Sequence, residues 1–360
     1  MSYLEAIKLA LLFFPLLAFL FTIPFILSQY HRYGSINKFR VLIIYSFILY
    51  IITVYFLAIF PLPDKDSIVM NSNAYQLIPF NFIFDILSRN YDGVFEFFVS
   101  PAVYTVLFNL IMFMPFGIYL RYYFEKDLKH VFTFSFLFSL FLELTQLTGL
   151  YFIYPYPYRI FDVDDLFINT MGGIIGYFIA GLFMRFLPSR DDIDLESMEE
   201  GRKISGLRRI MRFLLDGFIW LVFYFILYLF FDIHGLVFSL LIYYVLIPSL
   251  NKGQTLGSKF LKMRFEFPDR LFFRLFFRLI FVILYYIVIP FGVGYLFLFL
   301  SKWFKFSDFV TFMFVFVYVI LLGVFYLFNI GKIFKREVLI YDRIFKLKYV
   351  STIGEEKTTV

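Results

Sequence analysis

Long apolar runs, separated by short polar segments, make up most of this chain of 360 residues. A helix needs about 20 such residues to cross the hydrocarbon core of a bilayer. Nine runs that we predict to cross it lie at residues 9–27, 41–60, 101–120, 131–150, 165–184, 213–231, 236–250, 275–298 and 308–329. The pattern predicts an all-α, polytopic integral membrane protein with about nine transmembrane helices. Pro290 interrupts the eighth run, so we expect a kink there.

The composition excludes several other classes of protein. Hydrophobic residues account for 61% of the chain and charged residues for only 17%, and the mean hydropathy is +0.81. These values exclude an ordinary soluble domain, and the high content of Phe and Tyr excludes a disordered chain. There is no cysteine. Disulfides, thiolate metal sites and cysteine nucleophiles are therefore excluded together.

The distribution of basic residues predicts the orientation in the membrane. With the N-terminus outside, the cytoplasmic segments hold 27 of the 33 Lys and Arg residues. Because Lys and Arg resist translocation, we expect an N-out, C-in protein. The net charge of +6 then follows from this topology and from the anionic lipid of the inner leaflet, and gives little reason to propose nucleic acid as a partner.

A strongly polar stretch divides the chain, and we expect it to be a cytosolic linker between two helical membrane domains. The expected organisation is a domain of about five helices at residues 1–187, the linker at 188–202, a domain of about four helices at 203–351 and a polar C-terminal tail at 352–360. No internal repeat connects the two halves.

Polar side chains gather in the first half, where charged and amide groups inside membrane helices are costly and mark candidates for function. One helix face of the fourth run carries Ser135, Ser139, Glu143 and Gln146. The start of the fifth run carries Arg159, Asp162, Asp165 and Asn169, followed at helical spacing by Gly173 and Gly176. The glycines would let another helix approach closely. Asn109 adds an amide from the third run.

Two interpretations of this polar cluster compete. In the first, Glu143, Arg159 and the aspartates form a buried ion-pair network that holds the helices together. In the second, they line a polar pocket that opens to the outer leaflet. The four acids Glu143, Asp162, Asp164 and Asp165 face one local base, Arg159, and this excess of acid favours the pocket. The neighbouring aromatic loop at residues 151–158 is typical of a membrane interface.

Three motifs in the first half resemble the VanZ family, which includes the teicoplanin-resistance protein. They are Asn109-x-x-x-Phe113-x-Pro115-x-Gly117, Glu143-x-x-Gln146 and Arg159-x-x-Asp162-x-x-Asp165-x-x-x-Asn169-x-x-Gly172. The resemblance covers about residues 40–185. It implies a multi-pass protein of the bacterial cell envelope and plasma membrane, associated with low-level glycopeptide antibiotic resistance. Gln76 stands where the family usually has Asn.

The second half carries a separate polar set. Asp216 lies two turns after Arg209, so we expect a salt bridge between them at the inner interface, for which Arg212 is a competing partner. With Asp342 and the box of Gly253, Gln254, Thr255 and Gly257, these residues resemble the RDD family over about residues 203–351. The resemblance implies a membrane module, with ion or solute transport suggested for some members. The plainer interpretation of Asp216 is a charge pair that holds the helix bundle.

The leading functional hypothesis is a non-enzymatic envelope protein whose outer pocket binds or shields a polar group. That group would belong to a lipid-linked cell-wall precursor or a glycopeptide, and membrane lipids would be the other partner. One alternative is a transporter of ions or small solutes that uses the intramembrane carboxylates. A second is a membrane enzyme that acts on lipid headgroups, with Glu143 as general base and a metal held by the aspartates. For the leading hypothesis we expect no catalytic residue, metal or cofactor.

Overall fold

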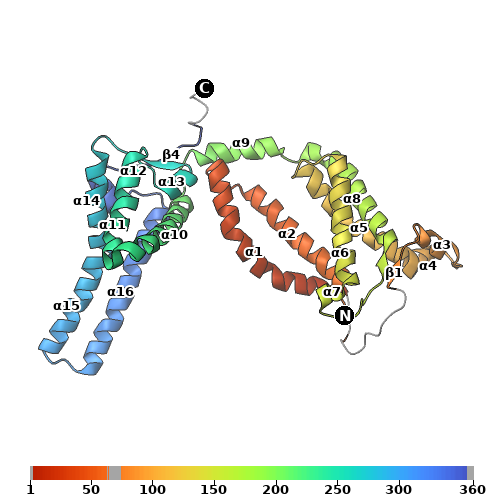
Figure 1. The fold of residues 1–360 in the computed structure, drawn as a ribbon, viewed down its shortest axis with the longest axis horizontal. Helices are drawn as coiled ribbons and strands as arrows, with labels where there is room; N and C mark the ends of the chain where they lie inside the picture. Colours follow the sequence, from red (N-terminus) through yellow and green to blue (C-terminus); the bar gives the residue numbers. More distant parts are fainter. Residues whose placement is uncertain (1–2, 63, 65–73, 355–360) are drawn as a thin grey trace. The chain divides into compact units, whose positions relative to one another are not determined.

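A computed structural model describes residues 3–62, 64 and 74–354 (Figure 1). Among these residues, eight helices are long and apolar enough to cross a membrane, and the strands form two small two-stranded sheets. The prediction of an all-α, polytopic membrane protein is therefore confirmed.

The chain divides into two compact units. The first comprises residues up to Thr22 together with Lys38–Ile193, and the second comprises Ile23–Asn37 together with the chain from Asp194 onward. Helix α1 (Tyr3–Tyr33) contributes residues to both units, as does α9 (Arg190–Gly201), which occupies most of the expected linker. Residues 23–37, expected to belong with the first domain, thus pack with the second half of the chain.

The first unit is built on membrane-spanning helices. Besides the first part of α1, these are α2 (Lys38–Ile59), α5 (Pro101–Tyr122), α6 (Leu128–Leu147) and α8 (Val163–Phe183), which η2 (Met184–Phe186) extends. The shorter elements are β1 (Tyr75–Gln76), α3 (Asn81–Leu87), α4 (Val94–Val99), α7 (Gly149–Phe152) and β2 (Phe161–Asp162). Strands β1 and β2 run parallel, with Gln76 opposite Asp162. This pairing brings the segment before α3 to the start of α8.

Glycines allow α5 and α8 to touch through their backbones. A Cβ atom added to Gly117 would lie 1.9 Å from the Gly173 carbonyl oxygen, and one added to Gly176 would lie 2.0 Å from that of Met114. Gly172 is equally close to Leu110, at 2.2 Å. The predicted glycine stripe is therefore confirmed as a surface of close helix approach. It fixes the register that brings Asn109 of α5 beside Asp165 of α8.

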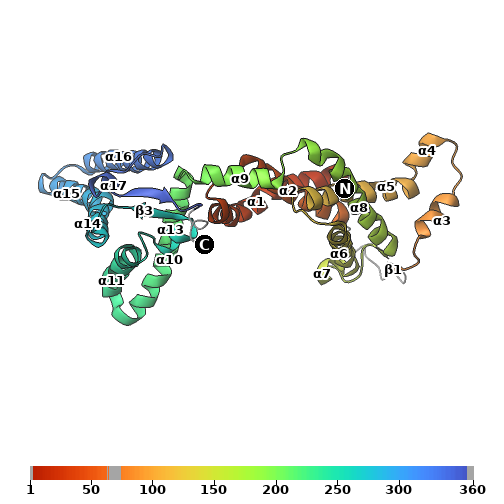
Figure 2. The same ribbon diagram turned by 90° about the horizontal axis from the view of Figure 1, so that it is seen from above.

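The second unit contains the predicted sixth and seventh spans in one continuous segment. It consists of α10 (Gly206–Phe231), η3 (Asp232–His234), α11 (Gly235–Leu241), the π-helical turn η4 (Ile242–Leu246) and α12 (Ile247–Leu250). The chain reverses after α10, so that α10 and α11 run side by side (Figure 2). The indole nitrogen of Trp220 donates to the Ser239 hydroxyl at 3.1 Å across this hairpin. The two predicted spans are thus its two arms.

The remaining helices of the second unit lie beyond a short polar segment. They are α13 (Leu256–Phe260), α14 (Leu271–Ile283), the π-helical turn η5 (Leu284–Val288), α15 (Ile289–Trp303), α16 (Asp308–Phe334) and α17 (Ile340–Ile344). A π-helical turn directly precedes Pro290, and another precedes Pro248. Proline lacks the N–H that a regular helix would use, and such widened turns occur where a helix changes course. The expected irregularity at Pro290 is therefore present.

A small antiparallel sheet closes one end of the second unit. Strand β3 (Met263–Glu266) pairs with β4 (Lys348–Ser351), with Met263 opposite Ser351. The sheet contributes Phe265 to a core cluster with Val245, Leu271, Leu275 and Leu347. It holds the chain after α16 against α10 and α14, where the second polar set lies.

Candidate functional site

The polar face of α6 is buried, as its spacing predicts. Ser135 and Ser139 are fully buried, Glu143 is 4% exposed and Gln146 is 6% exposed. These side chains follow one another along the helix at intervals of three or four residues, so all four face the same neighbours.

Glu143 is anchored to the start of α8. Its Oε2 accepts a hydrogen bond from the backbone N–H of Asp162 at 3.1 Å. Asp162 is the N-cap residue of α8, and its own side chain accepts from the Asp164 backbone N–H at 2.8 Å. The unpaired N–H groups and dipole at a helix N-terminus favour carboxylates. This explains why acids can gather here without a basic partner.

Next to the Glu143–Asp162 contact, a chain of hydrogen bonds links α5, α6 and α8. The Asn109 amide donates to Asp165 Oδ1 at 2.7 Å, and the Ser139 hydroxyl donates to the Asp165 carbonyl oxygen at 3.3 Å. The Asn169 amide in turn donates to Ser139 Oγ at 2.9 Å. The structure therefore brings Asn109, Glu143, Asp162, Asp165 and Asn169 together in one polar cluster.

Arg159 and Gln146 lie at the edge of this cluster and bind the end of α2. The Arg159 guanidinium donates to the carbonyl oxygens of Ala58 and Phe60, each at 2.9 Å, and the Gln146 amide also donates to Ala58, at 2.8 Å. Carbonyl groups at a helix C-terminus lack partners and attract cations. Arg159 is thus engaged by the main chain and makes no ion pair among the described residues. The interpretation of the cluster as an ion-pair network is not what the structure shows.

Three buried polar atoms in this unit have no hydrogen-bond partner among the described residues. They are the Tyr158 hydroxyl, Asn169 Oδ1 and Ser135 Oγ. Ser135 packs against Gly173, where an added Cβ would lie 2.1 Å from its hydroxyl oxygen. Buried polar groups are nearly always hydrogen-bonded, so each exception requires an explanation such as bound water or a ligand.

Asp162 of the cluster and the neighbouring Tyr158 lie outside the membrane-spanning helices and have shifted pKa values. Burial raises the pKa of the Asp162 carboxyl, and the carboxylates of Asp164 and Asp85 raise it further against the opposing effect of the Asp164 N–H bond. Burial also raises the pKa of Tyr158 to about 12. The Tyr158 phenol is therefore protonated near neutral pH and can donate a hydrogen bond.

Asp164 plays a part that the sequence did not reveal. It is 3% exposed, and its carboxylate accepts hydrogen bonds from the backbone N–H groups of Phe80 and Phe82, the latter at 2.9 Å. It thereby caps α3 from the first turn of α8. Among the described residues, the side chain of Gln76 makes hydrogen bonds only within its own turn, to the backbone of Ile78. The sequence shows the acid but not a partner more than 80 residues away.

The aromatic loop beside the cluster begins with strained backbone. Leu150, Tyr151 and Phe152 have φ values of 54°, 56° and 69°, in the left-handed region that ordinary residues avoid. The hydroxyl groups of Tyr151 and Thr145 are 2.7 Å apart, which ties the loop to α6. Phe152 is 86% exposed at its tip. Strain of this kind accumulates at functional sites.

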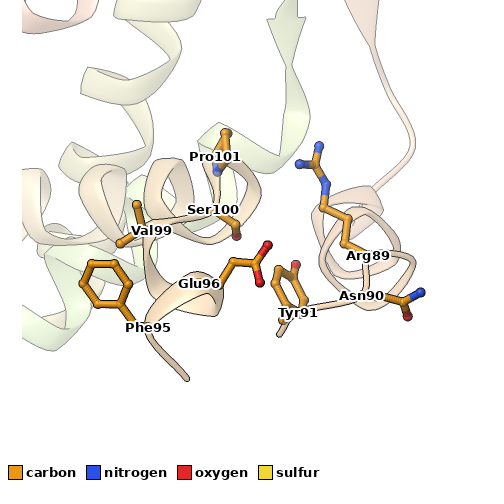
Figure 3. A pocket seen from close by; sticks show the side chains of 8 residues that line it. All are labelled: Arg89, Asn90, Tyr91, Phe95, Glu96, Val99, Ser100 and Pro101. Atoms are coloured by element: carbon orange, nitrogen blue, oxygen red, sulfur yellow. The ribbon is translucent and has the colours of Figure 1, made fainter. Parts of the chain in front are cut away.

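A shallow open pocket lies apart from the polar cluster, between the end of α3 and the start of α5 (Figure 3). It is lined by Arg89, Asn90, Tyr91, Phe95, Glu96, Val99, Ser100 and Pro101. None of the predicted site residues lines it. The Glu96 carboxylate accepts from the Asp92 backbone N–H at 2.6 Å, so this acid closes its own turn.

In the second polar set, the aspartates pair with other arginines than the sequence predicts. Arg209 lies 3.8 Å from Asp342, whereas Asp216 lies 3.8 Å from Arg212. Asp342 is also bound by Arg278 at 2.7 Å. The predicted Arg209–Asp216 salt bridge is therefore wrong, and the competing partner Arg212 takes its place. A separation of four residues puts Arg212 directly beside Asp216 on α10, whereas Arg209 is a further turn away.

The glycine-containing box wraps around Asp216. The Thr255 hydroxyl donates to Asp216 Oδ2 at 2.8 Å, and the Gly257 N–H donates to Oδ1 at 2.9 Å. A Cβ atom at Gly257 would lie 2.5 Å from Oδ1, so a larger residue there would displace the Asp216 carboxylate. Gly253 adopts a φ of 83°, and Gln254 donates to the Met263 carbonyl oxygen at 3.2 Å. The box is thus a scaffold for one buried carboxylate.

No group of three or more His, Asp or Glu side chains in the described part of the chain is placed to hold a metal ion. Glu143, Asp162 and Asp165 are directed toward separate amide donors instead.

Comparison with known proteins gives one family. Residues 42–184 match the VanZ/LLP1 family model. No curated protein and no solved structure matches the chain. The matched region contains the whole polar cluster of α5, α6 and α8, as the motif resemblance predicted. The chain is therefore a multi-pass protein of the bacterial cell membrane that carries a VanZ-like domain at residues 42–184.

Proposed function

We propose that the polar cluster of the VanZ-like domain binds a polar group that donates hydrogen bonds, and that this binding contributes to glycopeptide (teicoplanin) resistance. The group belongs to a lipid-linked cell-wall precursor or to a glycopeptide. Hydroxyl, amide and ammonium groups of such molecules are the donors that buried carboxylates require.

One observation carries this proposal. Glu143 is buried and Asp165 is half-buried, and neither carboxyl group has a basic partner within ion-pair distance among the described residues. The nearby base, Arg159, is directed to the carbonyl oxygens at the end of α2. Each of the two acids accepts one hydrogen bond, Glu143 from the Asp162 N–H and Asp165 from the Asn109 amide, although a carboxyl group can accept several. A ligand that supplies donors would fill the remaining acceptor positions.

The surroundings of the carboxylates also fit a polar ligand at a membrane surface. The Tyr158 hydroxyl, which has no hydrogen-bond partner in the described part of the chain, adds a donor beside them. The exposed ring of Phe152 is suited to the interface where lipid-linked groups lie. We further propose the N-out, C-in orientation, which places this end of α8 at the outer face.

The orientation can be tested with single cysteines because the chain has none of its own. A cysteine at Phe152 should react with a membrane-impermeant maleimide in intact cells, and a cysteine at exposed Arg336 should react only after the membrane is opened. The reverse pattern would place the cluster on the cytoplasmic side and remove the proposed ligands from reach.

The function is tested by replacing each acid with its amide. Glu143→Gln and Asp165→Asn should each abolish the increase in teicoplanin resistance that the protein confers on a susceptible host, with unchanged amounts in the membrane. Glu125→Gln is the matched control, because Glu125 is an exposed acid of the same unit whose ion pair with Arg190 contributes little. If both the Glu143 and the Asp165 variants retain resistance, the proposal fails.

We also propose that residues 203–351 form an RDD-like module in which Arg209, Asp216 and Asp342 serve mainly as a scaffold. What supports this is their burial together in one set of charge pairs and their contact with the glycine-containing box. Asp216 accepts hydrogen bonds from Tyr243, Thr255 and Gly257, so its bonding capacity is largely used within the fold.

A further inference from the structure

Arg212 is a nearly buried cation without a hydrogen bond. Its side chain is 11% exposed, and none of its N–H groups donates to any residue that the structure describes. The nearest carboxylate oxygen, Oδ2 of Asp216, is 3.8 Å from Nε, beyond hydrogen-bond distance. The N–H donors of Arg212 therefore have no acceptor among the residues that the structure describes.

Asp216 does not turn toward Arg212 because its oxygens are already engaged. Oδ1 accepts from the Tyr243 hydroxyl and the Gly257 N–H, and Oδ2 accepts from the Thr255 hydroxyl. These three donors hold the carboxylate toward the glycine-containing box. Asp216 therefore accepts no hydrogen bond from its charge partner, Arg212.

Positive charge is in excess around this point. Arg209, Arg212 and Arg278 are each at most 15% exposed, and they share the two carboxylates of Asp216 and Asp342. Asp342 makes its ion pairs with Arg209 and Arg278, and Arg212 is paired with Asp216 alone among the described residues. An unbalanced charge away from water is costly, so this cluster favours the binding of an anion.

Aromatic rings hold the Arg212 guanidinium in place. Its central carbon lies 4.9 Å from the centre of the Tyr349 ring and 5.7 Å from that of Phe265. The two rings hold the guanidinium by cation–π contact, which uses none of its N–H donors.

We propose that Arg212, supported by Arg209 and Arg278, forms an anion site in the second unit that binds a phosphate-type oxyanion. Two sources share this chemistry, a free phosphate and the headgroup of an anionic phospholipid. The site lies at the end of α10 that the predicted orientation places at the inner leaflet, where both sources are present.

The test uses the full chain, purified in an uncharged detergent and freed of lipid. Inorganic phosphate and phosphatidylglycerol are titrated separately, with chloride and phosphatidylcholine as their respective controls, and the thermal unfolding midpoint is measured. Phosphate or phosphatidylglycerol should raise the midpoint of the unmodified protein. Arg212→Gln should weaken the apparent affinity about tenfold or more, because a charge-assisted contact is lost. Arg336→Gln, at an exposed arginine of the same unit, should respond like the unmodified protein.

Each outcome decides the proposal. A response to both probes supports a phosphate site open to either source, and a response to phosphatidylglycerol alone supports a lipid headgroup site. If Arg212→Gln does not fold, Arg212→Lys replaces it, and loss of the planar fork should still weaken binding. No response of the unmodified protein, or an equal response of the Arg212 variant, overturns the proposal.

Discussion

The backbone N–H of Asp162 donates to the Glu143 carboxyl group at 3.1 Å, and this bond joins the buried face of α6 to the N-cap residue of α8. It holds the acid side chain in place. An amide at position 143 would keep an oxygen for the same bond. The Glu143→Gln variant therefore reports on the need for an acid group at this position, with little change to the architecture of the site.

The contact between α5 and α8 should not tolerate a single added methyl group at Gly176. Gly176→Ala places a Cβ atom 2.0 Å from the Met114 carbonyl oxygen, so the helices must separate. We expect a loss of about 1–3 kcal/mol in unfolding free energy, as for other overpacked interiors. Unfolding in mixed micelles measures it. Gly323→Ala is the control, since a Cβ there meets nothing within 4 Å. Equal stability of the two variants would contradict the observed packing.

Removal of the Asp164 carboxylate should loosen the segment that leads into α3. Asp164→Ala leaves the N–H groups of Phe80 and Phe82 without their acceptor, and loss of such a cap costs about 1–2 kcal/mol. Hydrogen exchange at these two amides should accelerate, while exchange within α6 stays unchanged. Exposed Asp85 provides the control variant, Asp85→Asn. Unaltered protection of Phe80 and Phe82 would show that Asp164 does not cap α3.

The carboxyl of Asp162 should destabilise the fold at neutral pH. Burial raises its pKa above the ordinary value of 3.8, so the folded protein holds its proton more tightly than the unfolded chain does. The ionised form therefore weakens the fold above the folded pKa, and this effect disappears as pH falls through that pKa toward 3.8. Asp162→Asn keeps a capping oxygen and should be more stable than the parent at pH 7. If Asp162→Asn were still more stable than the parent by the same amount below pH 4, this would contradict the raised pKa of Asp162.

Asp216 should matter for the second unit more through its hydrogen bonds than through its charge. Asp216→Ala leaves Tyr243, Thr255 and Gly257 without their acceptor and strands Arg212, at a cost of about 3–5 kcal/mol. Asp216→Asn preserves one acceptor oxygen, so its unfolding free energy should fall by less than that of Asp216→Ala. The yield of folded protein after extraction and its unfolding free energy measure both. A larger loss for the asparagine variant would show that the charge is what the fold requires.

Periodicity predicted the parts of the site that lie along one helix. The spacing of Ser139, Glu143 and Gln146 places them on one face whatever their neighbours are, and the glycines of α8 predict close packing from their size alone. The choice of partner between elements was not predictable in this way. Arg159 has both acids and helix-end carbonyls within reach, and only the fold shows that it contacts the carbonyls.

The same limit applies in the second unit. Two arginines on α10 lie within reach of Asp216 in the sequence, and the pairing depends on where β4 and α17 place Asp342. The VanZ resemblance rested on motifs from three helices and was confirmed by the family match over residues 42–184. The RDD resemblance stays a prediction.

Direct binding tests the central claim most sharply. The full chain in nanodiscs is titrated with a purified lipid-linked cell-wall precursor and, separately, with teicoplanin, and the dissociation constants are compared with those of Asp165→Asn and Glu125→Gln. We predict saturable binding of at least one of the two probes, weakened about tenfold or more by Asp165→Asn and unchanged by Glu125→Gln, because one charge-assisted hydrogen bond is lost. Absence of binding to either probe, or equal binding by the Asp165 variant, would contradict a ligand-binding role for the polar cluster.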